Sequence, residues 1–130
     1  MTHATIHFDG ASRGNPGPAG AGAVVELGGR ETVLSKHLGK ATNNEAEYEG
    51  LLLGLSFAQQ EGARRVVVRV DSQLIVRQLK GEYKVRAGNL KSLHRKASGL
   101  LSSFETSEVA WVPRERNGKA DQAANQALDA

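Results

Sequence analysis

Residues 64–71, RRVVVRVD, decide the fold class that this sequence predicts. Three consecutive valines are typical of a strand with apolar side chains on both faces, as in a central parallel strand buried under helices. Segments with helical spacing lie on both sides of this strand in the sequence. We therefore expect an α/β domain with this strand inside a mixed sheet.

Three antiparallel strands and a long helix are expected before the valine-rich strand. Alternating apolar residues predict strands over 4–9, 21–27 and 31–38, and Gly28-Gly29 is typical of a hairpin turn. Thr42, Asn43 and Asn44 are candidate N-caps of a helix that ends at Gly62. The period thus changes from two residues to helical spacing near residue 42.

Two helices, a strand and a last helix are expected after the valine-rich strand. The pattern predicts helices over 72–80, from an Asn89 cap to 104 and from an Asn117 cap to 128, with a strand over 108–112 that Pro113 ends. The resulting order is βββαβααβα. Right-handed crossovers then place the first strand parallel to the valine-rich one, in a five-stranded sheet flanked by helices.

Composition favours one compact domain. The chain has 130 residues, of which 39% are hydrophobic, so we expect a single domain over 1–130. It has no cysteine, which excludes disulfides and thiolate metal sites. No apolar run approaches the roughly 20 residues of a membrane span, and no secretory signal is visible at the start. We expect a monomeric, cytoplasmic protein that does not bind membranes.

Charge is distributed unevenly along the chain. Residues 64–96 hold ten of the 17 lysines and arginines but only two acids, Asp71 and Glu82. This stretch therefore carries a charge of +8, whereas the rest of the chain carries −5. Such asymmetry is expected for a protein with a polyanionic partner, and equally for a solvated helix face.

Two aspartates follow strands that we expect to be parallel neighbours. Asp9 and Asp71 would then meet at the carboxyl edge of the sheet, where ligand sites of open α/β sheets lie. Glu47 and Asp121, each about one turn into a helix, could join them. Four oxygen ligands without cysteine or paired histidine favour Mg²⁺ or Mn²⁺. Singly, each acid also suits a turn, a helix cap, a helix dipole or a solvated surface.

Four motifs in order resemble type 1 ribonuclease H over nearly the whole chain. They are Asp9-Gly-Ala-Ser with Gly14-Asn-Pro-Gly17, Thr42-Asn-Asn-Glu-Ala-Glu47-Tyr-Glu, Val70-Asp71-Ser-Gln73, and Trp111-Val-Pro-Arg-Glu-Arg-Asn-Gly-Lys-Ala-Asp121. The resemblance implies hydrolysis of the RNA strand of RNA/DNA hybrids by two Mg²⁺ ions, with Mn²⁺ as a substitute. The products would carry 5′-phosphate and 3′-hydroxyl ends.

The resemblance also implies roles for the matching residues. Asp9 would bridge both ions, Glu47 and Asp71 would hold the ion on the nucleophile side, and Asp121 would hold the more exposed ion. The RNA strand, read through its 2′-hydroxyls, would contact the backbone of Gly10, Ala11 and Ser12 and the side chains of Asn15, Asn43, Asn44 and Gln73. Lys40 and Thr42 match the positions at which the family binds a phosphate of the DNA strand. Thr42 and Asn43 also suit helix capping.

The sequence departs from the family pattern in two places. Residues 113–120 contain no histidine where many relatives have one, so Arg114 or Arg116 is a candidate replacement for its charge, with Asn117 as a further auxiliary residue. The basic, tryptophan-containing insertion of the long form is also missing at residues 81–88. Binding would then depend on residues such as Lys80, Lys84 and Arg86, with a steep salt dependence.

Several alternatives stay open at this point. A module of the same fold that binds nucleic acid but turns over weakly would share these motifs, as would a nuclease that also cuts double-stranded RNA. The four histidines have no metal-ligand spacing and are interpreted as structural. Trp111 is expected in the core at the edge of the last strand, rather than as a stacking platform for bases.

Overall fold

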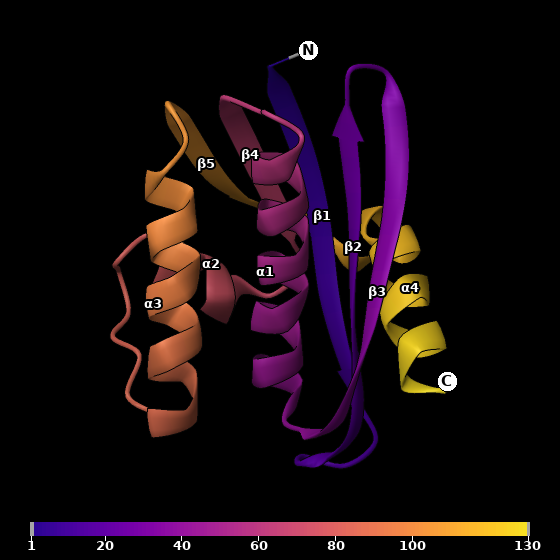
Figure 1. Ribbon diagram of the computed structural model, residues 1–130. Helices are drawn as coiled ribbons and strands as arrows, with labels where there is room; N and C mark the ends of the chain where they lie inside the picture. Colours follow the sequence, from indigo (N-terminus) through magenta and orange to yellow (C-terminus); the bar gives the residue numbers. More distant parts are fainter. Residues whose placement is uncertain (1, 130) are drawn as a thin grey trace.

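The computed structural model describes residues 2–129 as five strands and four α-helices (Figure 1). In chain order these are β1 (His3–Ser12), β2 (Gly17–Leu27), β3 (Arg30–Ala41), α1 (Asn43–Gln60), β4 (Arg65–Val70), α2 (Gln73–Leu79), α3 (Gly88–Ser102), β5 (Thr106–Trp111) and α4 (Gly118–Leu128). A short 3-10 turn, η1 (Arg114–Arg116), precedes α4. The predicted order βββαβααβα is confirmed. Within residues 2–129, none of the helices has the length and apolar character needed to cross a membrane.

The sheet has the strand order β3-β2-β1-β4-β5. β1, β2 and β3 are antiparallel neighbours, and β4 pairs in parallel with both β1 and β5. The β1–β4 register runs from His3 opposite Arg65 to His7 opposite Arg69. The predicted parallel pairing of the first strand with the valine-rich strand is therefore confirmed.

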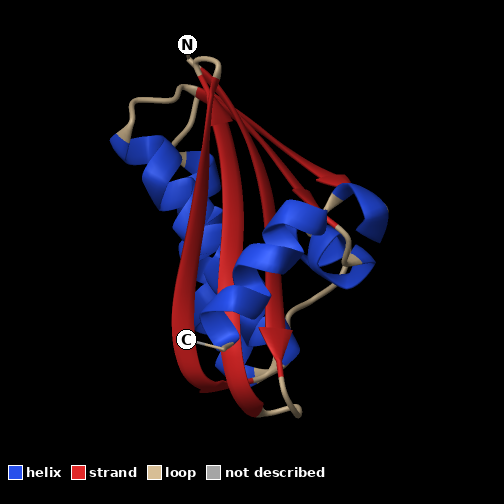
Figure 2. Ribbon diagram, turned by 90° about the vertical axis from the view of Figure 1, so that its right-hand side faces the viewer, coloured by secondary structure: helices blue, strands red, loops and turns tan. Residues whose placement is uncertain are grey.

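Helices cover both faces of the sheet, but unequally. α1 and α3 lie side by side on one face, and α4 crosses the other face over β1, β2 and β3 (Figures 1 and 2). The main core lies under α1 and α3 and includes Ile6, Phe8, Leu51, Leu55, Val66 and Val68, all at most 1% exposed. Val67 points to the other face and is only half-buried, because α4 lies over β1 to β3. The expectation that the valine-rich strand is buried on both faces was wrong.

Small residues extend the first two strands beyond their predicted ends. β1 continues to Ser12 and β2 begins at Gly17, with Asp9 opposite Gly22 and Ser12 opposite Ala19. Asp9 therefore lies inside β1, and the expectation that it ends the strand was wrong. The glycines in these stretches allow helices to approach the sheet.

Two glycines of β2 bring the backbone of α4 against the sheet. A Cβ atom at Gly20 would lie 2.4 Å from the Ala124 carbonyl oxygen, and one at Gly22 would lie 2.6 Å from the Ala120 carbonyl oxygen. Neither position has room for a methyl group. At these two positions α4 thus packs directly on the strand backbone.

Two further expectations were wrong at the other end of the sheet. Asn89 lies inside α3, whose N-cap is Ala87 without a side-chain hydrogen bond. Trp111 is 46% exposed rather than buried. It ends the edge strand β5, which packs against α3 and the seven-residue α2, and its indole Nε1–H donates to the Asp71 carbonyl oxygen at 3.2 Å.

Candidate active site

Three carboxylates from three elements meet beside the centre of the sheet. Asp9 lies in β1, Glu47 in the second turn of α1, and Asp71 directly after β4. One oxygen from each lies within 4.8 Å of the other two. Asp9 is only 8% exposed, and Glu47 and Asp71 are half-buried. Such a group of oxygen ligands fits a hard divalent cation.

Glycines place Glu47 close to Asp9. A Cβ at Gly10 would lie 2.3 Å from the backbone nitrogen of Glu47, and a Cβ at Gly50 would lie 2.6 Å from the carbonyl oxygen of Asp9. The first turns of α1 therefore touch the β1 backbone directly. A side chain at position 10 would push α1, and Glu47 with it, away from the other acids.

The three acids repel one another in a place that water reaches poorly. Burial, together with the Asp71 and Asp121 charges, raises the pKa of Asp9 to about 7, although the Gly10 N–H donates to Asp9 Oδ1 at 2.8 Å and opposes the shift. Burial and the charges of Asp9 and Asp71 raise the pKa of Glu47 to about 8, partly offset by Arg114. A bound cation would favour the ionised forms.

Asp121 lies at the outer side of these three acids. It is in the first turn of α4 and is exposed, and its contact with Asp9 helps to raise the pKa of Asp9. Asn125, one turn later, donates from Nδ2 to Asp121 Oδ1 at 3.3 Å. Asp121 is thus near Asp9 but outside the group within 4.8 Å.

The loop before α4 reaches the acids from the opposite side to α1. Arg114 is mostly exposed, and its Nε lies 3.5 Å from Asp71 Oδ2. Asn117 is 1% exposed, and its Nδ2 donates to the Phe8 carbonyl oxygen at 2.9 Å and to Asp71 Oδ1 at 3.3 Å. It occupies the predicted N-cap position of α4, but its side chain makes no capping bond.

Most of the polar residues expected to contact substrate lie in or next to two segments. These are the Gly-rich turn between β1 and β2 (residues 13–16) and the start of α1. Asn15 Oδ1 accepts from the Asn43 N–H at 3.0 Å, and Ser12 Oγ donates to the Ala41 carbonyl oxygen at 2.8 Å. Thr42 caps α1 in a capping box with Glu45, as its second interpretation predicted. Lys40 and Asn44 flank this junction in sequence.

Gln73 is the first residue of α2, two positions after Asp71, and is exposed. Gly10 and Ala11 lie on β1 directly after Asp9.

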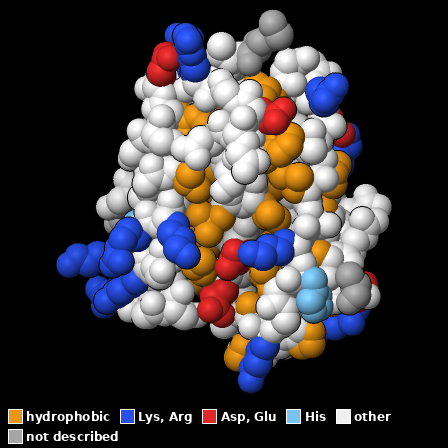
Figure 3. All heavy atoms as spheres, viewed as in Figure 1, with side chains coloured by type: hydrophobic (Ala, Val, Ile, Leu, Met, Phe, Trp, Pro, Cys, Tyr) orange, Lys and Arg blue, Asp and Glu red, His pale blue; other side chains and the backbone are white. Residues whose placement is uncertain are grey.

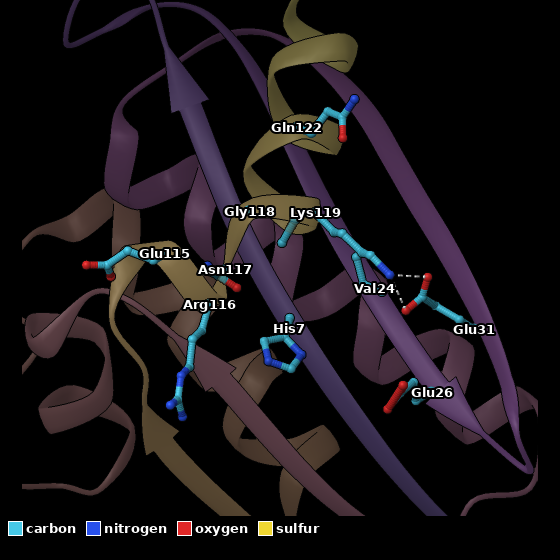
Figure 4. Close-up of a pocket in the computed structure, with 11 residues that line it drawn as sticks. His7, Val24, Glu26, Glu31, Glu115, Arg116, Asn117, Gly118, Lys119 and Gln122 are labelled. Atoms are coloured by element: carbon cyan, nitrogen blue, oxygen red, sulfur yellow. Dashed lines mark hydrogen bonds and ion pairs between the residues drawn. The ribbon is translucent and has the colours of Figure 1, made fainter.

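A cavity of about 500 Å³ lies beside the start of α4 (Figure 4). His7, Arg116, Asn117 and Lys119 are among its lining residues, and Lys119 Nζ lies 2.9 Å from Glu31 Oε2 across the β3 edge. Burial and the Arg69 charge lower the pKa of His7. Arg116 faces this cavity, whereas Arg114 contacts Asp71. Of the two arginines, only Arg114 has an ion pair with an acid of the site.

Comparisons with known proteins agree on one family. The family model described as "Reverse transcriptase-like" matches residues 7–127. The "Ribonuclease HI" of Halobacterium salinarum is 42% identical over 125 residues, which cover 95% of this chain and 63% of that protein. The crystal structure of RNase H1 from the same archaeon has a TM-score of 0.93 at 40% identity and covers 98% of each chain. This chain belongs to the type 1 ribonuclease H family.

Other relatives of this ribonuclease H domain differ in length. "Bifunctional protein Rv2228c" of Mycobacterium tuberculosis is 48% identical over 128 residues, which are 96% of this chain but only 35% of that protein. The domain thus spans about a third of that relative's length. The solved structure of LC11-RNase H1 in complex with an RNA/DNA hybrid has a TM-score of 0.89 at 39% identity, covering 97% of this chain and 96% of that one.

The raised pKa values predict how the stability of the metal-free protein depends on pH. Asp9 and Glu47 titrate at about 7 and 8 in the folded protein but near 4 when unfolded, so the folded state binds more protons between these values. We expect the unfolding free energy in a chelator to fall from pH 5 to pH 8, by up to about 1.4 kcal/mol per pH unit for each shifted group, and the melting temperature to fall with it.

Saturating Mg²⁺ should flatten this dependence, because the ion favours the ionised carboxylates. Asp9→Asn removes one of the two groups and should reduce the slope in chelator. Calorimetry of both proteins across this pH range measures the effect. A metal-free melting temperature that rises with pH would contradict the assignment of raised pKa values.

Proposed function

We propose that this domain hydrolyses the RNA strand of RNA/DNA hybrids with two divalent ions, preferably Mg²⁺, leaving 5′-phosphate and 3′-hydroxyl ends. The observation that carries the proposal is the convergence of Asp9, Glu47 and Asp71 within 4.8 Å, with Asp121 next to Asp9. The family membership and the hybrid complex of the similar LC11-RNase H1 support the choice of substrate.

The residues at the site fit a pair of hard cations. Asp9 lies between the group formed by Glu47 and Asp71 and the more exposed Asp121, which suits a shared ligand. When bound, Mg²⁺ would supply Lewis acidity toward an attacking water and a leaving 3′ oxygen. The protein's own contribution is to hold four carboxylates in place on or directly after two strands, β1 and β4, and on two helices, α1 and α4.

Arg114 contributes positive charge at the same place. Its guanidinium contacts Asp71 from solvent, so it can reach a phosphate that approaches this carboxylate. An arginine stays protonated near neutral pH and therefore cannot shuttle a proton as a histidine would. We propose electrostatic stabilisation as its role.

Selection of the RNA strand would use polar groups on both sides of the acids. The Asn15–Asn43 contact joins the Gly-rich turn to the start of α1, and Gln73 lies exposed beyond Asp71. Amide groups can both donate to and accept from a 2′-hydroxyl. Thr42 and Lys40 are proposed to bind a phosphate of the DNA strand.

Four fluorogenic substrates of one sequence test this function: a hybrid, an RNA duplex, a DNA duplex and single-stranded RNA. We expect cleavage of the RNA strand in the hybrid with Mg²⁺ and no cleavage in a chelator. Cleavage of the RNA duplex at a similar rate would indicate relaxed specificity. Hybrid binding without cleavage in Mg²⁺ or Mn²⁺ would identify a binding module instead.

Exposed basic residues near the α2–α3 connection predict a steep salt dependence. Figure 3 shows lysine and arginine side chains gathered at its lower left, where α3 begins. Lys80, Lys84, Arg86 and Lys91, which lie between the end of α2 and the first turn of α3, are all exposed. Lys84→Gln with Arg86→Gln should raise KM for the hybrid and lower the slope of log KM against log salt by about 0.9 for each lost phosphate contact.

The matched control for this variant is Arg64→Gln, which removes a cation at the opposite, amino end of β4, where Arg64 pairs with Glu105. It should leave the salt slope unchanged. Equal slopes for wild type and the Lys84, Arg86 variant would show that this basic region does not contact the hybrid.

A further inference from the structure

One buried asparagine connects three of the elements that carry the acids. Asn117 Nδ2 donates to the carbonyl oxygen of Phe8, the residue before Asp9, and to the Asp71 carboxylate. The backbone carbonyl of Asn117 accepts from the Asp121 N–H at 3.0 Å. β1, the end of β4 and α4 therefore meet at a single residue.

The position of this amide follows from the topology of the sheet. The β1–β4 register ends at His7 and Arg69, and the Phe8 carbonyl lies one residue beyond it. The Asn117 amide supplies a donor to this carbonyl. It thereby adds a hydrogen-bonded link between β1 and the end of β4, next to the carboxylates of Asp9 and Asp71.

The amide has a fixed orientation and an energetic cost. Both neighbours of Nδ2 are acceptors, so exchange of the amide nitrogen and oxygen would place Oδ1 against two oxygens. Within the described residues, Asn117 Oδ1 is buried and has no hydrogen-bond partner. A buried polar atom without a partner costs about 1–3 kcal/mol. The asparagine is thus a poor choice for stability alone.

We propose that Asn117 is a positioning residue that holds the Asp71 carboxylate in register with Asp9 and Asp121 for divalent-ion binding. It is 1% exposed and so does not touch substrate. Its effect passes through Asp71 and the backbones of β1 and α4. The inference rests on the proposed function, since it assigns Asn117 a part in the same metal-dependent site.

Asn117→Ala tests this role by removing the donor. Loss of a hydrogen-bond partner of a metal ligand typically costs about 10–100-fold in metal affinity or activity. We expect Mn²⁺ affinity, measured by calorimetry without substrate, to fall at least about tenfold, and kcat to fall by a similar factor with KM within about threefold. Asn89→Ala, an exposed asparagine in α3, should change neither quantity.

A measurement on the wild-type protein keeps the inference testable if Asn117→Ala does not fold. In NMR spectra of metal-free protein, the side-chain NH₂ group of Asn117 should exchange with solvent at least about 100-fold more slowly than that of Asn89, because it is buried and bonded. The NMR signals of this NH₂ group should also change chemical shift when Mg²⁺ is added. Exchange as fast as that of Asn89, or no shift with Mg²⁺, would overturn the proposal.

The outcomes separate this inference from the proposed function. Wild-type protein that binds Mn²⁺ and cleaves the hybrid, with a folded Asn117→Ala variant of unchanged Mn²⁺ affinity, would overturn the role of Asn117 alone. Wild-type protein without hydrolysis in any duplex would overturn the proposed function. The NMR comparison would then still report whether Asn117 senses divalent ions at Asp71.

Discussion

Asp9→Asn should abolish hybrid cleavage, lowering kcat by at least about 1,000-fold, while making the metal-free protein more stable at pH 8. The loss of activity follows because, in the proposed function, Asp9 would be the ligand shared between the two ion positions. Removing a charged ligand at the centre of such a site weakens both ions together. An amide oxygen at the same position is a weaker ligand for Mg²⁺.

The gain in stability follows from electrostatics. Asp9 is buried beside Glu47, Asp71 and Asp121, and burial and repulsion raise its pKa to about 7. At pH 8 the folded state must ionise this group at a cost, which asparagine avoids. We expect unfolding free energy in chelator to rise by about 1 kcal/mol or more, a gain of several degrees in melting temperature.

Asp129→Asn is the matched control for this variant. Asp129 is exposed and pairs with Arg13 at the surface, where a salt bridge contributes little. It should cleave as wild type does and melt within about a degree of it. Full activity in Asp9→Asn, or a clear loss of metal-free stability in it, would count against the site.

Gly10→Ala should both destabilise the domain and inactivate it. A methyl group at this position would lie 2.3 Å from the backbone of Ala46 and Glu47, so α1 must move. Forced overpacking costs about 1–3 kcal/mol and more against rigid backbone, so we expect a fall in melting temperature of roughly 10 °C. Displacing Glu47 by about 1 Å should lower kcat about 100-fold.

Gly99→Ala is the control that replaces a glycine by alanine where there is room for the added methyl group. Gly99 is in α3, is exposed, and has no atoms near the added methyl within 4 Å. Alanine there should stabilise the protein by about 0.5–1 kcal/mol and leave kcat unchanged. If Gly10→Ala behaved like Gly99→Ala, the close approach of α1 to β1 would not be needed for the site.

The types of the elements and their order could be predicted because each long segment has a clear period. The ends of β1 and β2 could not, since glycine and alanine carry almost no strand signal. The pairing of these residues in the sheet depends on contacts with α1 and α4, which are distant in sequence. The exposure of Trp111 was missed for a similar reason, because it depends on how little of the edge strand α2 covers.

The acids were found from motifs and from the parallel pairing of two strands. The pairing alone predicted that Asp9 and Asp71 would be close, and the structure places Glu47 with them. The contacts of Asn117 could not be found in this way. Its position before α4 predicted a helix cap, whereas its actual partners, Phe8 and Asp71, are far away in sequence.

The α4 backbone packs directly on Gly20 and Gly22, and this contact affects how the domain should lose activity on heating. At these two glycines no strand side chain separates the helix from the sheet, so we expect Asp121 to stay beside Asp9 for as long as the sheet is intact. Catalytic competence and global structure should accordingly vanish in one cooperative transition, with no active-site melting at lower temperature.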